Sequence, residues 1–218
     1  MADYHLYSAD ISPFAQRVVM QLEFKQIPFT ESVPPGGLKS EAFAAISRIG
    51  KIPVLQVGSV HLPESEVISE FLEQTHPDPS LLPDDPMERA NCRLIARIAD
   101  LYIMEAMVPL FANLSRATRN QEHVDRALSV LDRGLGYLEP WINPAVHAVG
   151  GRLTLADLAV APILRYAAEY PPIFGMTTPF GERPNVSSYY DRCREHALID
   201  SGLSRIEAGW QALRRKPQ

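Results

Sequence analysis

The sequence contains only two cysteines, Cys92 and Cys193, and they stand far apart. A disulfide-stabilised scaffold needs a set of paired cysteines, and a structural zinc site needs several Cys or His ligands at fixed spacing. Two distant cysteines exclude a disulfide-stabilised scaffold. Because the six histidines are also scattered along the chain, a structural zinc site is excluded as well. We therefore expect two unpaired thiols, as in a reducing cytoplasm, and no bound metal.

Positive charge and long apolar runs are also scarce. Lys and Arg total 21 against 26 Asp and Glu, so the formal net charge is −5. The basic run at residues 214–216 is too short for the positive face that nucleic-acid binding needs. No apolar run approaches the roughly 20 residues that span a bilayer, and the N-terminal segment lacks the features of a secretory signal. We expect a cytoplasmic protein that binds neither nucleic acid nor membrane.

The first 80 residues alternate between strand and helix patterns. Extended segments are expected at 4–8, 28–33, 53–57 and 60–62, and helices at 13–25, 40–47 and 65–75. A strand–helix–strand order predicts a parallel pair of strands. The last two strands, separated by Gly58 and Ser59, predict an antiparallel hairpin. Residues 1–78 are therefore expected to form a small α/β domain.

A proline-rich segment follows, and the strand patterns then end. Residues 76–87 contain four prolines, which indicates a linker that we place at 79–87. Helical spacing of apolar residues dominates the rest of the chain. The expected helices are 88–114, one from Val124 towards Ile142, 155–170, 184–196 and 201–213. Because 155–170 is apolar nearly all round, it should lie at the centre of an all-α bundle formed by residues 88–218.

Ser12 and Pro13 stand where the first expected helix begins. Ser suits the N-cap and Pro the first helical position, so an ordinary cap is one interpretation. A hydroxyl and free N–H groups at a helix N-terminus also favour an anion such as a thiolate. Since no basic partner is evident for Ser12, we expect it to donate a hydrogen bond to another sulfur rather than to attack.

Three further segments are candidates for ligand binding. If the Ile52–Pro53 bond is cis, the backbone groups of Ile52 are left free to pair with an extended peptide; an ordinary strand start is the alternative. Glu64 and Ser65 open a helix whose N–H groups suit a carboxylate, while Glu64 can accept from an ammonium group; an ordinary cap is again the alternative. Lys39 is either solvated or a cation for a carboxylate.

Taken together, these segments imply a ligand with a thiol, carboxylates at both ends and a free amine. Glutathione has that composition. In this order the segments resemble the cytosolic glutathione transferases over nearly the whole chain. The motifs that carry the resemblance are SPFAQRV, LKS, GKIPVL, PESEVI and GGRLTLADLAVAP. The first is similar to the active-residue motif of the tau and omega classes, in which tau-like members carry Ser and omega-like members carry Cys.

Two departures from the family pattern are visible. The Asn-Pro that often precedes the GK-x-P segment is absent, because ISRIGKIP stands there instead. The Ser-Ser-Cys run of the zeta class is missing, which weakens an assignment as maleylacetoacetate isomerase. In the last motif, Thr154 and Asp157 form a capping pair that we interpret as a folding feature.

The resemblance implies a thioredoxin-like first domain, an all-helical second domain and a homodimer. It also implies a role for each motif residue in binding glutathione. Ser12 would hold the thiolate, Lys39 and Lys51 the glycyl end, Ile52 next to Pro53 the cysteinyl backbone, and Glu64 with Ser65 the γ-glutamyl end. Tyr7 lies where some classes keep a catalytic tyrosine, but we expect it to pack against the sheet.

The implied function is a glutathione transferase of detoxification, which activates the thiol of its co-substrate for attack on a small hydrophobic electrophile. The electrophile pocket is expected between the domains, with Phe14, Met104, Met107 and Phe111 in its walls. For the last three, packing within the core of the helical bundle is the alternative and the more common role of such residues. Two alternatives stay open, because fold does not dictate function: another glutathione-dependent enzyme, such as a peroxidase or isomerase, or a non-catalytic binding protein of the same fold.

Overall fold

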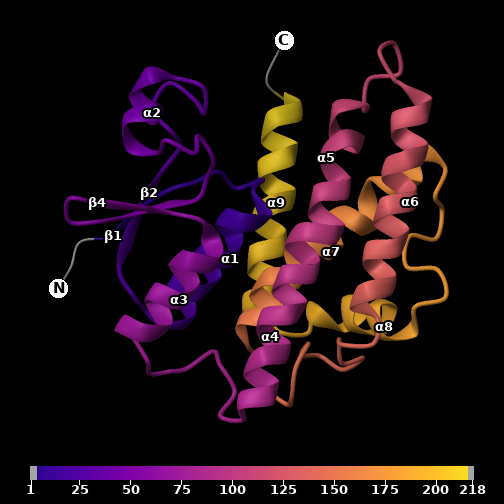
Figure 1. Ribbon diagram of the computed structural model, residues 1–218. Helices are drawn as coiled ribbons and strands as arrows, with labels where there is room; N and C mark the ends of the chain where they lie inside the picture. Colours follow the sequence, from indigo (N-terminus) through magenta and orange to yellow (C-terminus); the bar gives the residue numbers. More distant parts are fainter. Residues whose placement is uncertain (1–3, 216–218) are drawn as a thin grey trace. The chain divides into compact units, whose positions relative to one another are not determined.

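The computed structural model describes residues 4–215, so residues 1–3 of the N-terminal segment and Lys216 of the basic run lie outside the described part. The described chain forms two compact units (Figure 1). The first unit comprises residues 4–81 and 200–215, and the second comprises residues 82–199.

The first unit contains a four-stranded mixed sheet. Its strands are β1 (Tyr4–Tyr7), β2 (Phe29–Ser32), β3 (Val54–Val57) and β4 (Val60–Pro63), in the order β2-β1-β3-β4. β1 and β2 are parallel, whereas β3 is antiparallel to both β1 and β4. The expected strand–helix–strand unit followed by a hairpin is confirmed, and it is the thioredoxin-like arrangement.

Helices cover both faces of this sheet. They are α1 (Pro13–Phe24), α2 (Glu41–Ile46) and α3 (Ser65–Thr75), with α1 and α3 on one face and α2 on the other (Figure 1). Side chains from β1, β3, α1, α3 and the segment between α1 and β2 form one buried apolar core: Tyr4, Leu6, Val18, Val19, Leu22, Ile27, Leu55, Ile68 and Leu72. Burial of this apolar surface is the main force that holds α1 and α3 against the sheet.

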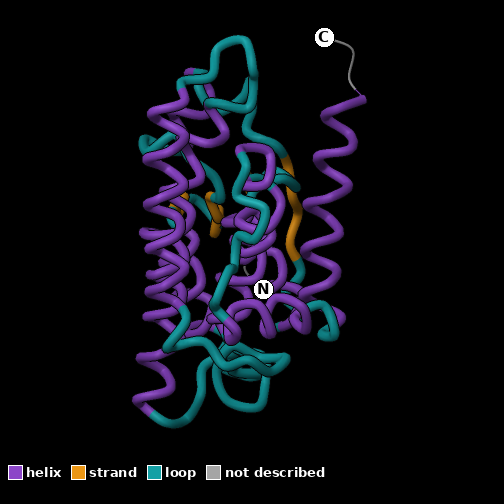
Figure 2. The backbone as a smooth tube through the Cα atoms, turned by 90° about the vertical axis from the view of Figure 1, so that its right-hand side faces the viewer, coloured by secondary structure: helices purple, strands orange, loops and turns teal. Residues whose placement is uncertain are grey.

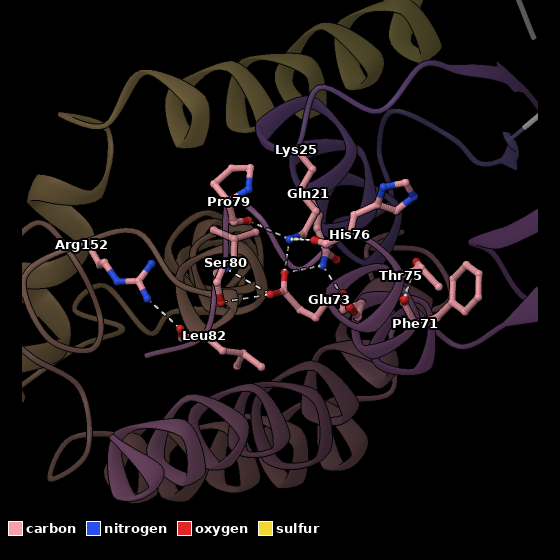
Figure 3. Close-up of polar contacts among 12 residues, drawn as sticks. Gln21, Lys25, Phe71, Glu73, Thr75, His76, Pro79, Ser80, Leu82 and Arg152 are labelled. Atoms are coloured by element: carbon pink, nitrogen blue, oxygen red, sulfur yellow. Dashed lines mark hydrogen bonds and ion pairs between the residues drawn. The ribbon is translucent and has the colours of Figure 1, made fainter. Parts of the chain in front are cut away.

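A buried ion pair joins α1 to α3 and to the segment that follows α3 (Figure 3). Lys25 Nζ lies 2.9 Å from Glu73 Oε1, and the two side chains are 0% and 5% exposed. The same ammonium donates to the carbonyls of His76 and Pro79 at 2.7 and 2.8 Å. Glu73 Oε2 accepts from the backbone N–H of Leu81 at 3.2 Å. These hydrogen bonds hold residues 76–81 against the first unit. The expected boundaries of the two domains and their linker, at residues 78 and 88, remain a prediction from the sequence.

Helix α9 (Ala197–Arg215) also contributes to the first unit from residue 200 onward. Gly202 and Gly209 mark close contacts. A Cβ atom on Gly202 would lie 2.5 Å from Met20 Sδ, and one on Gly209 would lie 2.9 Å from Asp10 Cβ. The helix therefore packs directly against α1 and against the loop that leads into α1.

Among the described residues of the second unit, helices are the only regular secondary structure, and loops join them. Figure 2 shows how far helices outweigh strands in the chain as a whole. Its helices are α4 (Pro86–Ile98), the π-helix η1 (Ala99–Met104), α5 (Glu105–Ala112), α6 (Gln121–Leu138), α7 (Leu155–Glu169), the 3-10 helix η2 (Pro171–Phe174) and α8 (Pro184–Cys193). Helix α7 is buried continuously from Leu155 to Ala167, as its apolar sequence predicts. Among the helices described, none combines the length and the hydropathy that crossing a membrane requires.

The start of α7 is held by the expected capping pair. The backbone N–H and the hydroxyl of Thr154 donate to Asp157 Oδ2 at 2.8 and 2.9 Å. Asp157 Oδ1 accepts from the Ala148 N–H at 2.6 Å and from the Tyr189 hydroxyl at 3.1 Å. Burial raises the pKa of this carboxyl, although its hydrogen bonds oppose the shift. The pair stabilises the fold, as its motif predicts.

The expected single helix over 88–114 is interrupted by a π-helical stretch. Helix α4 ends at Ile98, and η1 then runs to Met104 before α5 resumes. Helix α6 approaches η1 closely, since a Cβ on Gly134 would lie 2.1 Å from the Tyr102 carbonyl oxygen. The absence of a side chain at Gly134 is therefore what allows this helix pair to pack so tightly.

Candidate functional site

The candidate residues gather at one edge of the sheet because of its strand register. Tyr7, the last residue of β1, lies opposite Ser32 at the end of β2 and opposite Val54 at the start of β3. Val54 in turn lies opposite Pro63 at the end of β4. The segments that follow β1, precede β3 and follow β4 therefore leave the sheet at the same edge. They carry Ser12, the Ile52–Pro53 bond and the Glu64–Ser65 pair, respectively.

Ser12 is the N-cap of α1 and is half-buried. Its Oγ accepts a hydrogen bond from the Ala15 N–H at 3.2 Å. Within residues 4–215, neither the Ser12 O–H nor the Phe14 N–H has an acceptor. Pro13, between them, has no N–H. Two donors thus remain available at the positive end of the α1 dipole, where they can stabilise an anion.

The Ile52–Pro53 peptide bond is cis. Pro53 is buried and Ile52 is half-buried. Outside the sheet ladder, the backbone groups of Ile52 make no hydrogen bond to any described residue. These groups are available to pair with an extended peptide ligand in the manner of an added strand.

Glu64 and Ser65 begin α3 and differ sharply in exposure. Glu64 is exposed, has φ +71°, and forms no ion pair within the described residues. A positive φ is unusual for a residue with a side chain and is found preferentially at ligand sites. Ser65 is only 5% exposed, and its Oγ accepts from Arg17 Nη1 at 3.2 Å. That bond leaves the Ser65 O–H proton as a donor for a carboxylate.

Two lysines add positive charge to the loops that meet this edge. Lys39 and Lys51 are exposed, and neither is ion-paired in the part of the chain that the structure describes. Lys51 directly follows Gly50, whose φ of +68° gives the loop its turn. The two ammonium groups and the Glu64 carboxylate match a ligand with two carboxylates and one ammonium group.

Arg17 is a site residue that the sequence-based interpretation did not include. Its side chain is 1% exposed, and Nη1 lies 3.1 Å from Glu66 Oε1 as well as contacting Ser65. It therefore connects α1 to the first turn of α3. The one signal in the sequence is a charged residue directly beside Val18 and Val19, on the buried side of α1.

The four expected wall residues of the electrophile pocket are divided between the two units: Phe14 belongs to the first unit, and Met104, Met107 and Phe111 belong to the second. Tyr7 lies on β1 of the first unit. The Tyr7 hydroxyl donates to Gln56 Oε1 at 3.2 Å. Phe14, in the first unit, lies 5.6 Å beneath the guanidinium of Arg17. In the second unit, Met104 and Met107 are 9% and 0% exposed.

Phe111 is half-buried in the second unit. Its ring meets Tyr166 and Tyr170 edge-on, with centroid separations of 5.6 and 5.0 Å. These contacts belong to the helical unit itself, which is the setting that packing within the bundle also predicts. The electrophile pocket as a whole stays a prediction.

Two family models and several curated proteins match the chain. The glutathione S-transferase N-terminal domain matches residues 6–80, and the C-terminal domain matches residues 98–197. Maleylacetoacetate isomerase of Rattus norvegicus is 30% identical over 175 residues, which are 76% of this chain and 78% of that protein. A glutathione S-transferase of Pseudomonas putida is 31% identical over 154 residues, which are 70% of each chain. The relatives therefore include both transferases and isomerases.

Solved structures agree with this similarity. A glutathione S-transferase of Methylobacterium radiotolerans, crystallised with glutathione sulfonate, has a TM-score of 0.77 and 26% identity, and the match covers 92% of this chain and 94% of that one. A bacterial zeta-class maleyl pyruvate isomerase shares the fold, with a TM-score of 0.73 at 22% identity and coverage of 91% and 95%. With both domain models in sequence order and a thioredoxin-like sheet followed by a helical unit, the chain belongs to the glutathione S-transferase family.

Proposed function

We propose that the protein is a serine-type glutathione transferase, with Ser12 stabilising the thiolate of bound glutathione. The observation that carries the proposal is the pair of available donors, Ser12 O–H and Phe14 N–H, at the N-terminus of α1. A charge-assisted hydrogen bond contributes about 1.5–3 kcal/mol. Since one pKa unit corresponds to about 1.4 kcal/mol, the thiol pKa would fall by about one to two units.

The remaining contacts follow from the charges and free backbone groups at this edge. The glycyl carboxylate would meet Lys39 and Lys51, and the cysteinyl backbone would pair with Ile52 beside Pro53. The γ-glutamyl end would place its ammonium group at Glu64 and its carboxylate at the Ser65 hydroxyl, at the N-terminus of α3. Similarity to a structure that holds glutathione sulfonate supports glutathione as the ligand.

In the reaction, the sulfur attacks the electrophilic carbon with its electron pair, and a C–S bond forms. With an aryl chloride as electrophile, chloride leaves with the electron pair of the broken bond. Holding the thiolate beside the electrophile converts a bimolecular encounter into an intramolecular one, which supplies much of the acceleration. Phe14, Met104, Met107 and Phe111 are our candidates for the apolar wall that binds the electrophile.

A glutathione-dependent isomerase is the second candidate. The observation that favours it is the 30% identity to rat maleylacetoacetate isomerase. In such a reaction the thiolate adds to a carbon–carbon double bond, the resulting single bond rotates, and the sulfur leaves again, so that glutathione is regenerated. The same Ser12 contact would serve both reactions. The SPFAQRV motif leads us to favour a tau- or omega-like transferase over the zeta class.

The proposal also includes three properties that are typical of the family. They are a homodimer, a cytoplasmic location and a role in detoxification. Sedimentation of the purified protein tests the first of these directly, because a monomer at micromolar concentration would contradict it.

The experiment compares wild type with Ser12→Ala on an aryl chloride, a hydroperoxide and a cis-enone. We expect Ser12→Ala to lower kcat/KM on the preferred substrate by about tenfold or more, a loss of about 1.4 kcal/mol of transition-state stabilisation. Asn120→Ala is the control, because Asn120 caps α6 by accepting from the His123 N–H at 3.1 Å, in the other unit.

Each outcome has a distinct meaning. Unchanged turnover in Ser12→Ala would remove Ser12 from the mechanism. Turnover of the cis-enone alone would favour the isomerase. Calorimetric binding of glutathione without turnover of any substrate would favour a binding protein, and an absence of binding heat at millimolar glutathione would refute the proposal altogether.

A further inference from the structure

One face of α9 lies against the loop that carries Ser12. Gly202, Arg205 and Gly209 are spaced three and four residues apart, so they share that face of the helix. A Cβ on Gly209 would lie 3.0 Å from Ile11 Cγ2 and 3.3 Å from the Ile11 backbone nitrogen. The glycine therefore allows the helix backbone to reach the residue directly before Ser12.

Arg205 bonds this loop to the neighbouring strand. Its Nη2 lies 2.7 Å from Asp10 Oδ1 and 2.8 Å from Glu31 Oε2. The other carboxylate oxygen of Glu31 accepts from the hydroxyl of Ser8, which is 2% exposed. A closed ring of contacts thus runs from Ser8 through Glu31 and Arg205 to Asp10, and it spans the first half of the loop.

Hydrogen bonds of the backbone link Asp10 to Ser12 and to α1. The Ser12 N–H donates to the Ala9 carbonyl at 2.9 Å, which closes a turn around Asp10. The Asp10 carbonyl accepts from Nε2 of Gln16, a fully buried residue in the second turn of α1. Because the loop is held at both ends and by α1, we expect a shift of Asp10 to move the Ser12 hydroxyl as well.

We propose that Arg205 is a positioning residue for Ser12, holding the loop so that the hydroxyl meets the sulfur of glutathione. The inference rests on the proposed function of Ser12. Arg205 touches neither reactant; it acts through Asp10. Misplacement of a catalytic contact by about 1 Å lowers rates by up to about a hundredfold, so a loosened loop should lower activity measurably.

Exposure separates this role from a contribution to global stability. The side chains of Arg205, Asp10 and Glu31 are 30%, 50% and 24% exposed. Solvent reaches all three side chains and partly screens these ion pairs, so their contribution to the unfolding free energy should be smaller than that of a fully buried pair. The charged groups that act on Arg205 are Asp10 and Glu31, and Glu23 lies within electrostatic reach. Loss of the arginine should therefore change the loop far more than the unfolding transition.

The test measures the pKa of enzyme-bound glutathione from the ultraviolet absorbance of its thiolate, together with kcat and KM. In Arg205→Ala we expect the thiol pKa to rise by about half a unit to one unit and kcat to fall about fivefold to tenfold, with KM for glutathione changed less than twofold. Arg205→Lys should restore most of both values, because an ammonium group can still contact Asp10 or Glu31.

Arg126→Ala is the matched control, since Arg126 forms an exposed ion pair with Glu122 at 3.1 Å on α6. It should leave the thiol pKa and kcat unchanged. The unfolding midpoint in urea should shift only modestly in Arg205→Ala and hardly at all in Arg126→Ala, whose ion pair is far more exposed. A large shift in Arg205→Ala alone, with an unaltered thiol pKa, would overturn the inference in favour of a purely structural role.

Ser12→Ala separates a failure of this inference from a failure of the proposed function. If Ser12→Ala raises the thiol pKa and Arg205→Ala does not, the positioning role is refuted while the role of Ser12 stands. If neither variant changes the thiol pKa, both are refuted. If both raise it and the double variant adds little to Ser12→Ala, the two residues act through the same contact, which supports the inference.

Discussion

Replacing Glu73 with glutamine should destabilise the first unit by about 3 kcal/mol, because a buried ammonium group would lose its counter-charge. Removing one partner of a buried pair costs about 3–5 kcal/mol, and both side chains here are at most 5% exposed. Lys25 would keep two carbonyl acceptors, at 2.7 and 2.8 Å, so we expect the lower end of that range.

Urea unfolding measures this loss, and the two tryptophans allow the units to be observed separately. Trp141 lies in the second unit and Trp210 in the part of α9 that belongs to the first. In a Trp141→Phe background, fluorescence of Trp210 therefore reports the first unit. The midpoint for Glu73→Gln should move to clearly lower urea concentration, with the slope m unchanged.

Glu122→Gln is the comparison for an exposed pair. Glu122 and its partner Arg126 are 79% and 73% exposed, so we expect a change below about 0.5 kcal/mol, followed by far-ultraviolet circular dichroism. If Glu73→Gln unfolds with the same midpoint as its parent, Lys25 does not need the charge of Glu73. Burial would then not make the loss of a counter-charge costly at this position.

Two further pairs of measurements address the second unit. Gly134→Ala should destabilise the second unit by about 1–3 kcal/mol, since its Cβ would lie 2.1 Å from the Tyr102 carbonyl oxygen. Gly136→Ala should be neutral or stabilise the unit by up to about 1 kcal/mol, because the nearest atoms, in an arginine side chain, are 3.8 Å away. Thermal melts that shift equally in both variants would contradict the close approach of α6 to η1. Burial, followed by the charge of His147, lowers the pKa of His196 below 6.5. At acidic pH the unfolded state therefore binds more protons than the folded state. The free energy of unfolding is highest above pH 6.5 and decreases as the pH falls through the lowered pKa. His196→Gln should flatten that part of the stability curve, and identical slopes for variant and wild type would argue against the shift.

Most elements of the fold follow from local patterns in the sequence. Within residues 4–81 the strands and helices differ from expectation by at most one residue at each end, because proline, glycine and capping residues mark those ends directly. Helix α9, expected at 201–213, begins four residues earlier and ends two residues later. The π-helix Ala99–Met104 was missed because apolar residues continue through it at helical spacing. The packing of α9 onto the first unit was also missed, since it depends on Gly202 and Gly209 meeting residues that lie far away in the sequence.

The same distinction applies to the candidate site. Ser12, the segment before Pro53 and the start of α3 carry local signals, namely a cap, an X-Pro bond and a helix start. The two arginines carry no local signal that identifies their partners: Arg17 meets Ser65 across 48 positions, and Arg205 meets Asp10 across 195. Long side chains can reach many partners, so only the tertiary structure identifies the partner that each one takes.

The division of the first unit between two distant stretches of chain has a consequence for its synthesis. Every residue proposed to bind glutathione precedes position 66, yet α1 and the loop before it are covered by residues 200–215. A nascent chain that has already emerged from the ribosome through the whole sheet still exposes the α1 surface that α9 later covers. Domains generally fold in order from the N-terminus during translation. Here we expect glutathione binding to become possible only after α9 has been synthesised, because α9 packs against the loop that carries Ser12.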